Sequence, residues 1–442
     1  MIPSRRTYFL LLSGIIIAPT LTIFLGINTS ITIILLFDAA ILLLIFLDSW
    51  RSQSNRVEIT RQVAPRLSIG RDNPVELTVK TEKSQAIVEI CDYFPSGFVA
   101  AAAKLRAVIP ANSTQELTYT VNPPQRGEFA WGDIQVRQLG ALGLAWDNWK
   151  ISQSCKIKVY PDLMGLRSLS IRLTLQSSGS MRKLRNLGIG TEFAELRNYR
   201  NGDDLRFVDW KATARRAAYR NSPPLVRVLE PEQEQTLMIL LDRGRLMTAR
   251  VQNLQRFDWG LNAALSLALA GLHRGDRVGV GVFDRSIHTW IPPERGQHQL
   301  NNLIDRLTPI QPVLMESYYL GAVTKVVQQQ TRRCLVVVIT DIVDVTASTE
   351  LLAALSKLSP RYLPFCVTLR DPKVDNLAHN SSIEKGVTGA YNRAVALDLL
   401  SQRQVAFAQL KQKGVLVLDA PANQITDNLV DRYLQLKAKN QI

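Results

Sequence analysis

The sequence contains few of the residues that form catalytic and metal sites. Its four cysteines cannot build a disulfide framework in 442 residues, and its four histidines show no metal-ligand spacing. The motifs CxxC, HExxH, GxSxG and GxxxxGK[ST] are absent, so nothing indicates a zinc hydrolase, a serine hydrolase or a P-loop nucleotide site. Cys334 and Cys366 lie within apolar, strand-like runs, which predicts buried and reduced thiols.

Acidic residues are also outnumbered. The chain carries 53 lysines and arginines against 38 aspartates and glutamates, a net charge of +15. A basic balance fits nucleic acid, an anionic membrane face or acidic protein partners. The length is enough for two or three domains.

Two apolar runs near the N-terminus contain no lysine or arginine. Tyr8–Ile27 has the ~20 residues that cross a bilayer as a helix, and Ile31–Leu47 is a second, slightly shorter run. Asn28–Ser30 is predicted as the turn between them. A signal peptide is disfavoured, because the first run lacks an A-x-A-like end and a second run follows at once. The sequence therefore predicts a transmembrane helical hairpin over residues 1–50.

Arginines flank both runs. Arg5 and Arg6 precede the first, and Arg51, Arg56 and Arg61 follow the second. The positive-inside rule places both flanks in the cytoplasm, where cysteines stay reduced. We therefore expect a two-span protein of the inner (plasma) membrane with the bulk of the chain in the cytoplasm.

One carboxylate lies within the second run. Asp38 near a bilayer centre costs roughly 2.5–3.5 kcal/mol, and folding the hairpin about Thr29 sets it level with Thr20. Two interpretations stay open. Asp38 forms a polar lock with Thr20 or with another membrane helix, or it is a protonated acid that reaches the nearer interface.

Residues 51–161 change to a period of two. Strand-like runs such as Pro74–Thr81 and Cys155–Pro161 alternate with Pro, Gly and Asn turns. Several such strands with little helix predict an antiparallel β-sandwich. The region has no nucleophile with a base, so a spacer or binding module is favoured over an enzyme.

Residues 230–442 alternate apolar strands with amphipathic helices. Thr236–Asp242 and Cys334–Asp341 are apolar runs that each end in aspartate, and Leu254–Gly275 is a helical pattern between them. This order predicts an α/β domain with a doubly wound parallel sheet. Ligands of such sheets bind beyond the strand C-termini. Asp242 and Asp341 are therefore expected to face one crevice if their strands flank the switch point.

The same residues, 230–442, resemble a von Willebrand factor A domain. That family binds a divalent metal through D-x-S-x-S after the first strand, a threonine from a later loop and an aspartate after the fourth strand. In this sequence the first aspartate is Asp242, and Asp341 matches the last one. Gly244 and Leu246 replace the two serines, and the threonine position falls within Met315–Ser317. The resemblance therefore implies a degenerate metal site.

The changes at these positions disfavour a cation. Mg²⁺ needs six oxygens, two hydroxyls are lost, and Arg243 and Arg245 stand beside the site. We expect no metal and no cofactor, with a guanidinium paired to Asp242 or Asp341 instead. The alternative from a different class is a metal-dependent ligand-binding module that still uses both aspartates.

Residues 162–229 form a basic connecting segment. From Arg182 to Arg227 it has 11 basic and 5 acidic residues. Its core resembles the signature of the domain-of-unknown-function family fifty-eight. The matching positions are Gly190, Glu192, Phe193, Leu196, Arg197, Tyr199, Gly202, Asp203, Asp204, Arg206, Asp209, Trp210, Ala212, Ala214 and Arg215.

The resemblance extends to the layout of the chain, with a membrane hairpin, a β region, the signature and an A-type domain in that order. Members of the family are often encoded with MoxR-type AAA+ ATPases and other A-domain proteins. The resemblance therefore implies a membrane-anchored, non-catalytic adaptor or assembly factor that works with such an ATPase. It implies no activity of its own.

The signature residues by themselves predict a turn followed by a helix. Asn201–Asp203 is turn chemistry, and Asp203 or Asp204 can cap a helix over Arg206–Ala217. The spacing i, i+3, i+7 predicts a buried helix face, formed by Phe207, Trp210 and Ala214.

Three functions compete for the charged residues of the signature. A hydrolase would use the carboxylates as acid and base, but no nucleophile or histidine accompanies them. A nucleic-acid surface is disfavoured, because the aromatic residues fit a buried face better than a stacking platform. The favoured interpretation is an ion-pair network that also docks a partner, with stabilisation of the fold alone as its alternative. Its residues are Arg197, Arg200, Asp203, Asp204, Arg206, Asp209, Trp210, Lys211 and Arg215.

Overall fold

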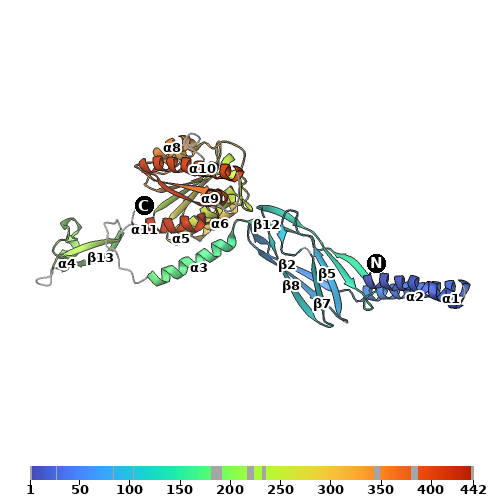
Figure 1. Cartoon of the computed structure of the whole chain (residues 1–442). Coiled ribbons are helices and arrows are strands. Elements are labelled where there is room, and N and C mark those ends of the chain that lie inside the picture. Colours follow the sequence, from blue (N-terminus) through green and yellow to red (C-terminus); the bar gives the residue numbers. More distant parts are fainter. Residues whose placement is uncertain are drawn as a thin grey trace. The chain divides into compact units, whose positions relative to one another are not determined.

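The chain forms two compact units, Met1–Leu163 and Met164–Ile442 (Figure 1). The structure is a computed structural model. It describes residues 2–25, 27–82, 84–102, 104–180, 192–216, 223–230, 235–342, 349–379 and 387–439.

The first unit begins with two apolar helices that pack against each other, α1 (Arg5–Leu25) and α2 (Ile27–Ser54) (Figure 1). Among the described residues, one helix is long and apolar enough to cross a membrane by length and composition, over Asn28–Ser54. The N-terminal apolar helix is therefore the feature that indicates membrane association. The second span expected from the sequence stays a prediction.

The polar residues between the two apolar runs belong to α2. The turn predicted at Asn28–Ser30 is wrong, because these residues lie in the first turn of the helix, where the first backbone amides have no partner within the helix and polar side chains can bond them. The hairpin consequently folds before Asn28, and Asp38 lies level with Gly14. A Cβ atom added to Gly14 would lie 3.7 Å from Asp38 Oδ1. The predicted partner Thr20 has a side chain outside the described atoms.

Three small sheets make up the rest of the first unit. Their strand orders are β1-β11-β10-β5-β7, β2-β4-β8-β6 and β3-β12-β9. Side chains alternate between buried and less buried along β4 and β5, as period-two patterning predicts. The strands are β1 (Ile2–Pro3), β2 (Glu58–Val63), β3 (Arg66–Ser68), β4 (Asn73–Lys80), β5 (Ala86–Asp92), β6 (Val99–Ala100), β7 (Leu105–Ile109), β8 (Thr114–Asn122), β9 (Gly127–Trp131), β10 (Ile134–Leu139), β11 (Ala145–Ile151) and β12 (Cys155–Tyr160).

The neighbouring strands of these sheets pair antiparallel, as predicted, except that β3 and β12 are parallel. That the sheets together form a β-sandwich stays a prediction.

A buried ion pair joins strands from different sheets. Asp92, at the end of β5, accepts hydrogen bonds from Arg61 on β2 (2.6 Å), the Tyr119 hydroxyl on β8 (2.6 Å) and the Trp131 indole on β9 (3.1 Å). The Arg61 side chain is 2% exposed. Arg61 is therefore part of the core of the first unit.

The loop between β10 and β11 is bonded to the base of the hairpin. The carboxylate of Asp48, on α2, accepts backbone amides of this loop. The donors are Leu142 (2.9 Å), Leu144 (3.0 Å) and Ala145 (3.2 Å). In the other direction, the hydroxyls of Ser4 and Thr7 donate to the carbonyls of Gly143 and Leu144. The Asp48 carboxylate also fills the space that a Cβ atom at Gly140 would need.

The second unit is built on a six-stranded sheet with the order β19-β18-β15-β20-β21-β22. All neighbours pair in parallel except β19, which is an antiparallel edge strand. The predicted parallel sheet is thus confirmed apart from this edge. The strands are β15 (Thr236–Asp242), β18 (Arg277–Phe283), β19 (Ile287–Glu294), β20 (Leu335–Thr340), β21 (Leu363–Arg370) and β22 (Leu416–Pro421).

Helices cover both faces of this sheet. In Figure 1, α8 and α10 lie on one side and α5 and α11 on the other, because the buried central strands need apolar cover on each face. The helices are α5 (Arg256–His273), α6 (Gln297–Leu307), α7 (Tyr319–Gln329), α8 (Thr349–Ser356), α9 (Pro372–His379), α10 (Val387–Gln412) and α11 (Ile425–Ala438). A 3-10 helix, η2 (Arg245–Thr248), and a small hairpin of β16 (Arg250–Val251) and β17 (Leu254–Gln255) follow β15.

Five shorter elements precede the six-stranded sheet in the chain. They are α3 (Leu163–Ser180), β13 (Glu192–Asn198), the 3-10 helix η1 (Leu205–Phe207), α4 (Trp210–Arg216) and β14 (Leu225–Glu230). β13 and β14 pair antiparallel, and they carry the signature residues between them.

Candidate functional site at the carboxyl end of the central sheet

The two aspartates predicted to meet lie at the ends of neighbouring strands. Asp242 is the last residue of β15, and Asp341 directly follows β20. β15 and β20 pair in parallel, with Leu241 opposite Ile339. The strand order reverses here, so both carboxylates lie at the switch point of the sheet, as expected.

Asp242 is surrounded by hydrogen-bond donors. Asp242 is 0% exposed, and both of its carboxylate oxygens accept hydrogen bonds. Oδ1 accepts from the Ser317 hydroxyl and the Gly244 amide (2.7 Å), and Oδ2 accepts from the hydroxyls of Thr340 (2.7 Å) and Tyr319 (3.0 Å). Burial raises the pKa of Asp242 above its ordinary value, although these four donors act in the opposite direction.

Asp341 is held by two guanidinium groups. Arg256, the first residue of α5, bonds its Oδ2 atom at 2.8 Å, and Arg403, on α10, bonds its Oδ1 atom at 2.8 Å. Arg403 also bonds Asp419 of β22 at 2.9 Å, and Arg370 bonds the other oxygen of Asp419 at 3.0 Å. A buried row of alternating charges therefore crosses this end of the sheet.

A guanidinium was predicted to pair with Asp242 or Asp341, and two of them pair with Asp341. Arg243 and Arg245, which stand beside the site in the sequence, pair elsewhere. Arg243 bonds Asp284 at 2.6 Å and Arg245 bonds Glu316 at 2.7 Å. The amide of Ser286 and the Arg243 guanidinium lower the pKa of Asp284, although burial opposes them.

The residues at this site do not fit the divalent metal of A-type domains. Gly244 has no side-chain oxygen, and the Ser317 hydroxyl fills the space that a Cβ atom there would need. Leu246 offers only its backbone carbonyl, which accepts a hydrogen bond from Arg256 (2.9 Å). Asp341, the position that matches the family best, is already paired with two positively charged guanidinium groups. A further cation would therefore meet electrostatic repulsion rather than free ligands.

Restoring a serine at position 244 is expected to destabilise the site without creating metal affinity. Gly244→Ser places its Cβ atom against the Ser317 hydroxyl and 2.8 Å from the Met315 carbonyl, and overpacking of this kind typically costs about 1–3 kcal/mol. Thermal unfolding with and without Mg²⁺ measures both effects. A Mg²⁺-dependent rise in the unfolding temperature of this variant would contradict the interpretation. Gly275→Ser is the control, because nothing lies near a Cβ atom added at this position. Its destabilisation measures the cost of a serine without overpacking, together with the strain of the left-handed backbone at Gly275.

A cavity of about 700 Å³ lies beside Asp242 and shares Ser317 with it. Three of its lining residues expose large apolar side chains, Leu314 (79%), Met315 (53%) and Tyr318 (48%). The other named lining residues are Arg285, Glu316 and Glu350. This combination of exposed apolar and charged groups suits a protein surface better than a small polar substrate.

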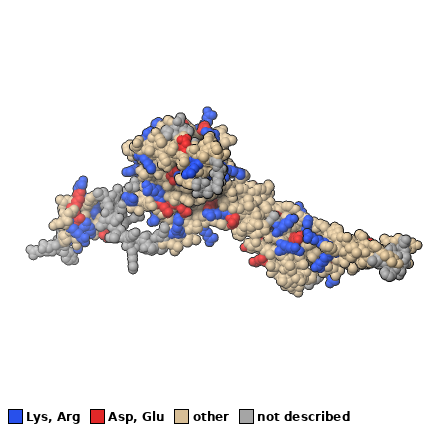
Figure 2. All heavy atoms as spheres, viewed as in Figure 1, with Lys and Arg blue, Asp and Glu red and all other residues tan. Residues whose placement is uncertain are grey.

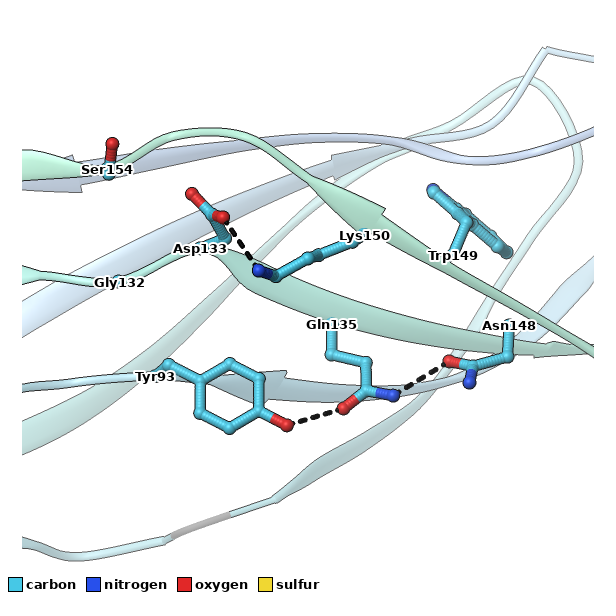
Figure 3. Close-up of a pocket in the computed structure, with 8 residues that line it drawn as sticks. All are labelled: Tyr93, Gly132, Asp133, Gln135, Asn148, Trp149, Lys150 and Ser154. Carbon is cyan, nitrogen blue, oxygen red and sulfur yellow. Dashed lines mark hydrogen bonds and ion pairs between the residues drawn. The ribbon is translucent and has the colours of Figure 1, made fainter.

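A second cavity, of about 650 Å³, lies on the first unit over β10 and β11 (Figure 3). Its polar side chains are bonded to one another. The Tyr93 hydroxyl donates to Gln135 (2.7 Å), the Gln135 amide donates to Asn148 (3.1 Å), and Lys150 pairs with Asp133 (3.0 Å). These bonds leave the cavity with a balanced charge and no group poised for chemistry.

In the signature, two of the predicted arginine–aspartate pairs are present. Arg197 forks onto both oxygens of Asp203 (2.7 and 2.6 Å), and Arg206 bonds Asp204 (2.7 Å). Hydrogen bonds from these guanidinium groups lower the pKa of both aspartates. Asp204 also caps η1 by accepting the Arg206 amide.

Asp209 uses a partner that the sequence did not indicate. It accepts the Ala212 amide (2.9 Å) at the start of α4 and bonds Arg227 of β14 (2.9 Å), and the Ala212 bond lowers its pKa most. The remaining cationic side chains, those of Arg200, Lys211 and Arg215, are exposed. Gly190 of the signature lies outside the described residues.

The helix of the signature is shorter than predicted, and its tryptophan is exposed. A 3-10 turn and a separate α4 replace the single helix expected over Arg206–Ala217, because Asp209 caps α4 and starts it at Trp210. Trp210 is 65% exposed, whereas Val208, one residue before the cap, is 5% exposed. The predicted buried face was therefore wrong, since Ala214 is exposed as well and Phe207 is only half-buried.

Sequence reasoning missed the residues that complete the sheet site. Thr340 stands directly beside Asp341, so a polar residue ending an apolar strand was an available signal. Arg403 lies among buried Ala396, Ala406 and Phe407 on α10, and a lone arginine on an apolar helix face indicates a buried partner. No local pattern pointed to Arg256.

Comparison with known proteins gives one family and several partial likenesses. Residues 195–389 match the family model described as "Protein of unknown function DUF58". Uncharacterized proteins of Mycobacterium tuberculosis and Mycobacterium bovis are 27% identical over 156 residues, which are 35% of this chain and 48% of each relative. The matched region thus spans about half the length of these relatives.

Several solved structures resemble part of the chain, among them two from Bacteroides. One is an aerotolerance-related membrane protein from Bacteroides fragilis, at 15% identity and a TM-score of 0.30, covering 45% of this chain and 99% of that one. The other is a conserved hypothetical protein, BatB, from Bacteroides thetaiotaomicron, at 14% identity and a TM-score of 0.30, covering 46% of this chain and 99% of that one.

Proposed function

Since residues 195–389 match the DUF58 family model, we propose that the chain is a membrane-anchored, non-catalytic adaptor or assembly factor. Its partner is a MoxR-type AAA+ ATPase, together with other A-domain proteins. The α1–α2 hairpin anchors it with two spans in the inner (plasma) membrane. The β region and the A-type domain then work in the cytoplasm.

One observation carries the proposal of a non-catalytic role. At the switch point, where ligands of α/β sheets bind, both carboxylates are already bonded within the chain. Asp242 accepts from four donors and Asp341 from two arginines. A general acid or base has to exchange a proton with its substrate. The four donors around Asp242 occupy its acceptor positions, and the two guanidinium groups on Asp341 stabilise its charged form.

The signature supports docking as the function. Its aspartates hold Arg197, Arg206 and Arg227 in place. Lys211 and Arg215 extend into solvent next to the exposed Trp210. Exposed tryptophan with arginine is the composition of interface hot spots, and the cationic side chains suit an acidic partner surface.

Charge reversal tests the docking surface. The full chain in nanodiscs is immobilised, and the purified MoxR-type ATPase is passed over it. Lys211→Glu with Arg215→Glu is expected to slow association about tenfold at low salt, since interface charges act mainly on the association rate. A matched control reverses two exposed cations of the first unit, Arg137→Glu with Lys156→Glu, and is expected to bind as the wild type.

Each negative outcome has a distinct meaning. If the two double variants associated at equal rates, the proposal that the signature is the docking surface would be wrong. If the ATPase did not bind the wild-type chain, the proposal that it is the partner would be wrong. The alternative, a metal-dependent ligand-binding module, requires Mg²⁺ binding by the same sample that is lost in Asp341→Ala, which calorimetry detects.

A further inference from the structure

The base of the hairpin presents a surface that the adaptor role does not use. Here the helices α1 and α2 meet the loop between β10 and β11. The polar backbone of this loop is covered. The Asp48 carboxylate accepts hydrogen bonds from three backbone amides. The hydroxyls of Ser4 and Thr7 donate hydrogen bonds to two backbone carbonyls of the loop. Bonded backbone can approach a layer that is poor in water at little cost.

Large apolar side chains on the elements that meet here are exposed to solvent. Leu142, at the tip of the loop, is 54% exposed. Tyr8 of α1 is 55% exposed and Trp50 of α2 is 65% exposed. The backbone amide of Leu142 donates a hydrogen bond to the Asp48 carboxylate, which holds Leu142 beside α2. Asp48 directly follows the apolar run Ile31–Leu47. Tyrosine and tryptophan are enriched where a membrane meets water.

Cations occur at the same level and not further along the hairpin. Arg5, Arg6 and Arg51 are exposed, and no lysine or arginine lies between Thr7 and Trp50. On the face that Figure 2 displays, lysines and arginines lie over the strands of the first unit and not over the hairpin. Arginine beside an apolar surface matches the phosphate groups of anionic lipids.

We propose that these residues form one basal surface that sits in the headgroup layer of an anionic bilayer. The basal surface consists of Arg5, Arg6, Tyr8, Trp50, Arg51 and Leu142. Leu142, Tyr8 and Trp50 lie at the acyl boundary, and the three arginines bond lipid phosphates. The loop of the β region is thereby a membrane contact in addition to the hairpin. This inference rests on the proposed membrane anchoring.

Depth-dependent fluorescence quenching tests the basal surface. The full chain, with its four cysteines replaced by serine, receives one cysteine at Leu142 and an environment-sensitive NBD label. It is reconstituted into phosphatidylcholine–phosphatidylglycerol vesicles whose acyl chains are brominated near the headgroup or near the bilayer centre. Two control labels use exposed positions of the same unit, Val108→Cys on β7 (51% exposed) and Leu35→Cys on α2 (63% exposed).

The expected pattern separates the inference from the anchoring. The label at 142 is quenched severalfold more by shallow bromines than the label at 108, and the label at 35 is quenched most by deep bromines. Quenching at 142 no greater than at 108, with 35 still quenched, would overturn the basal surface alone. No quenching at 35 would overturn the anchoring as well. Ala141→Cys, the neighbouring exposed position, repeats the measurement should Leu142→Cys fold poorly.

Lipid charge tests the role of the arginines. In the labelled chain with Arg5, Arg6 and Arg51 intact, quenching at position 142 is expected to weaken when phosphatidylglycerol is replaced by phosphatidylcholine. Replacing Arg5, Arg6 and Arg51 together by glutamine is expected to remove this dependence. Quenching that depends on phosphatidylglycerol to the same extent in both proteins would contradict the phosphate contacts.

Discussion

Arg403→Met is expected to destabilise the second unit by about 3–5 kcal/mol, the usual cost of breaking a buried ion pair by removing one partner. The arginine bridges Asp341 and Asp419, whose side chains are 3% and 10% exposed. Methionine preserves much of the stem that packs near Phe407 but removes all the donors. Both carboxylates would then remain buried, with one guanidinium each.

Native-state hydrogen exchange is the suitable measurement, because a chain of two units does not unfold in one step. Peptides that contain β20 and β22 should lose protection in Arg403→Met, while peptides of the first unit should keep it. Lys411→Met removes an exposed cation from the same helix and is expected to leave exchange unchanged. Equal protection in the two variants would show that Arg403 does not hold this end of the sheet together.

Asp92→Ala is expected to have a comparable effect on the first unit. It removes the shared acceptor of Arg61, Tyr119 and Trp131 and leaves the Arg61 charge, 2% exposed, without its carboxylate. Loss of one partner of such a pair costs about 3–5 kcal/mol. Hydrogen exchange should rise in β5, which carries Asp92, and in β2, β8 and β9, which supply its partners. It should stay unchanged in β15 and β20.

Glu128→Ala is the matched control for Asp92→Ala. Glu128 pairs with Lys158 across β9 and β12, but both side chains are more than half exposed, and such pairs contribute little to stability. No resolvable change in exchange is therefore expected. If the two variants behaved alike, the buried pair would contribute no more than an exposed one.

The central strands could be predicted from the sequence almost to the residue. The apolar run Thr236–Asp242 is the whole of β15, because a strand buried on both faces has to be apolar at every position. The same argument located β20 and the two aspartates that end these strands. It could not place β19 antiparallel at the edge, since pairing direction depends on how the chain returns and not on composition.

Local chemistry was less reliable where a residue type serves two purposes. Asparagine and serine occur in turns and at helix starts alike, and at Asn28–Ser30 the helix prevailed. Helical spacing placed Trp210 on a buried face, but the Asp209 cap begins α4 at Trp210 and leaves it exposed.

The partners of the site residues were beyond sequence reasoning for a different reason. Arg403 and Asp341 are 62 residues apart, and charge pairing at that separation depends on how α10 crosses the sheet. The resemblance to A-type domains predicted an altered metal site through Gly244 and Leu246. Which guanidinium would stand there, Arg243, Arg245 or another, required the three-dimensional arrangement.

The row of arginines at the end of the sheet also bears on how the domain responds to its surroundings. A side chain that supplies positive charge is covalently part of the polypeptide, so no chelator can withdraw it and no change in the calcium or magnesium level can alter its occupancy. Proteins that rely on a dissociable ion can be turned on and off by the supply of that ion. Here Arg256 and Arg403 are present at every moment at which the domain is folded, so the positive charge around Asp341 does not depend on the supply of an ion.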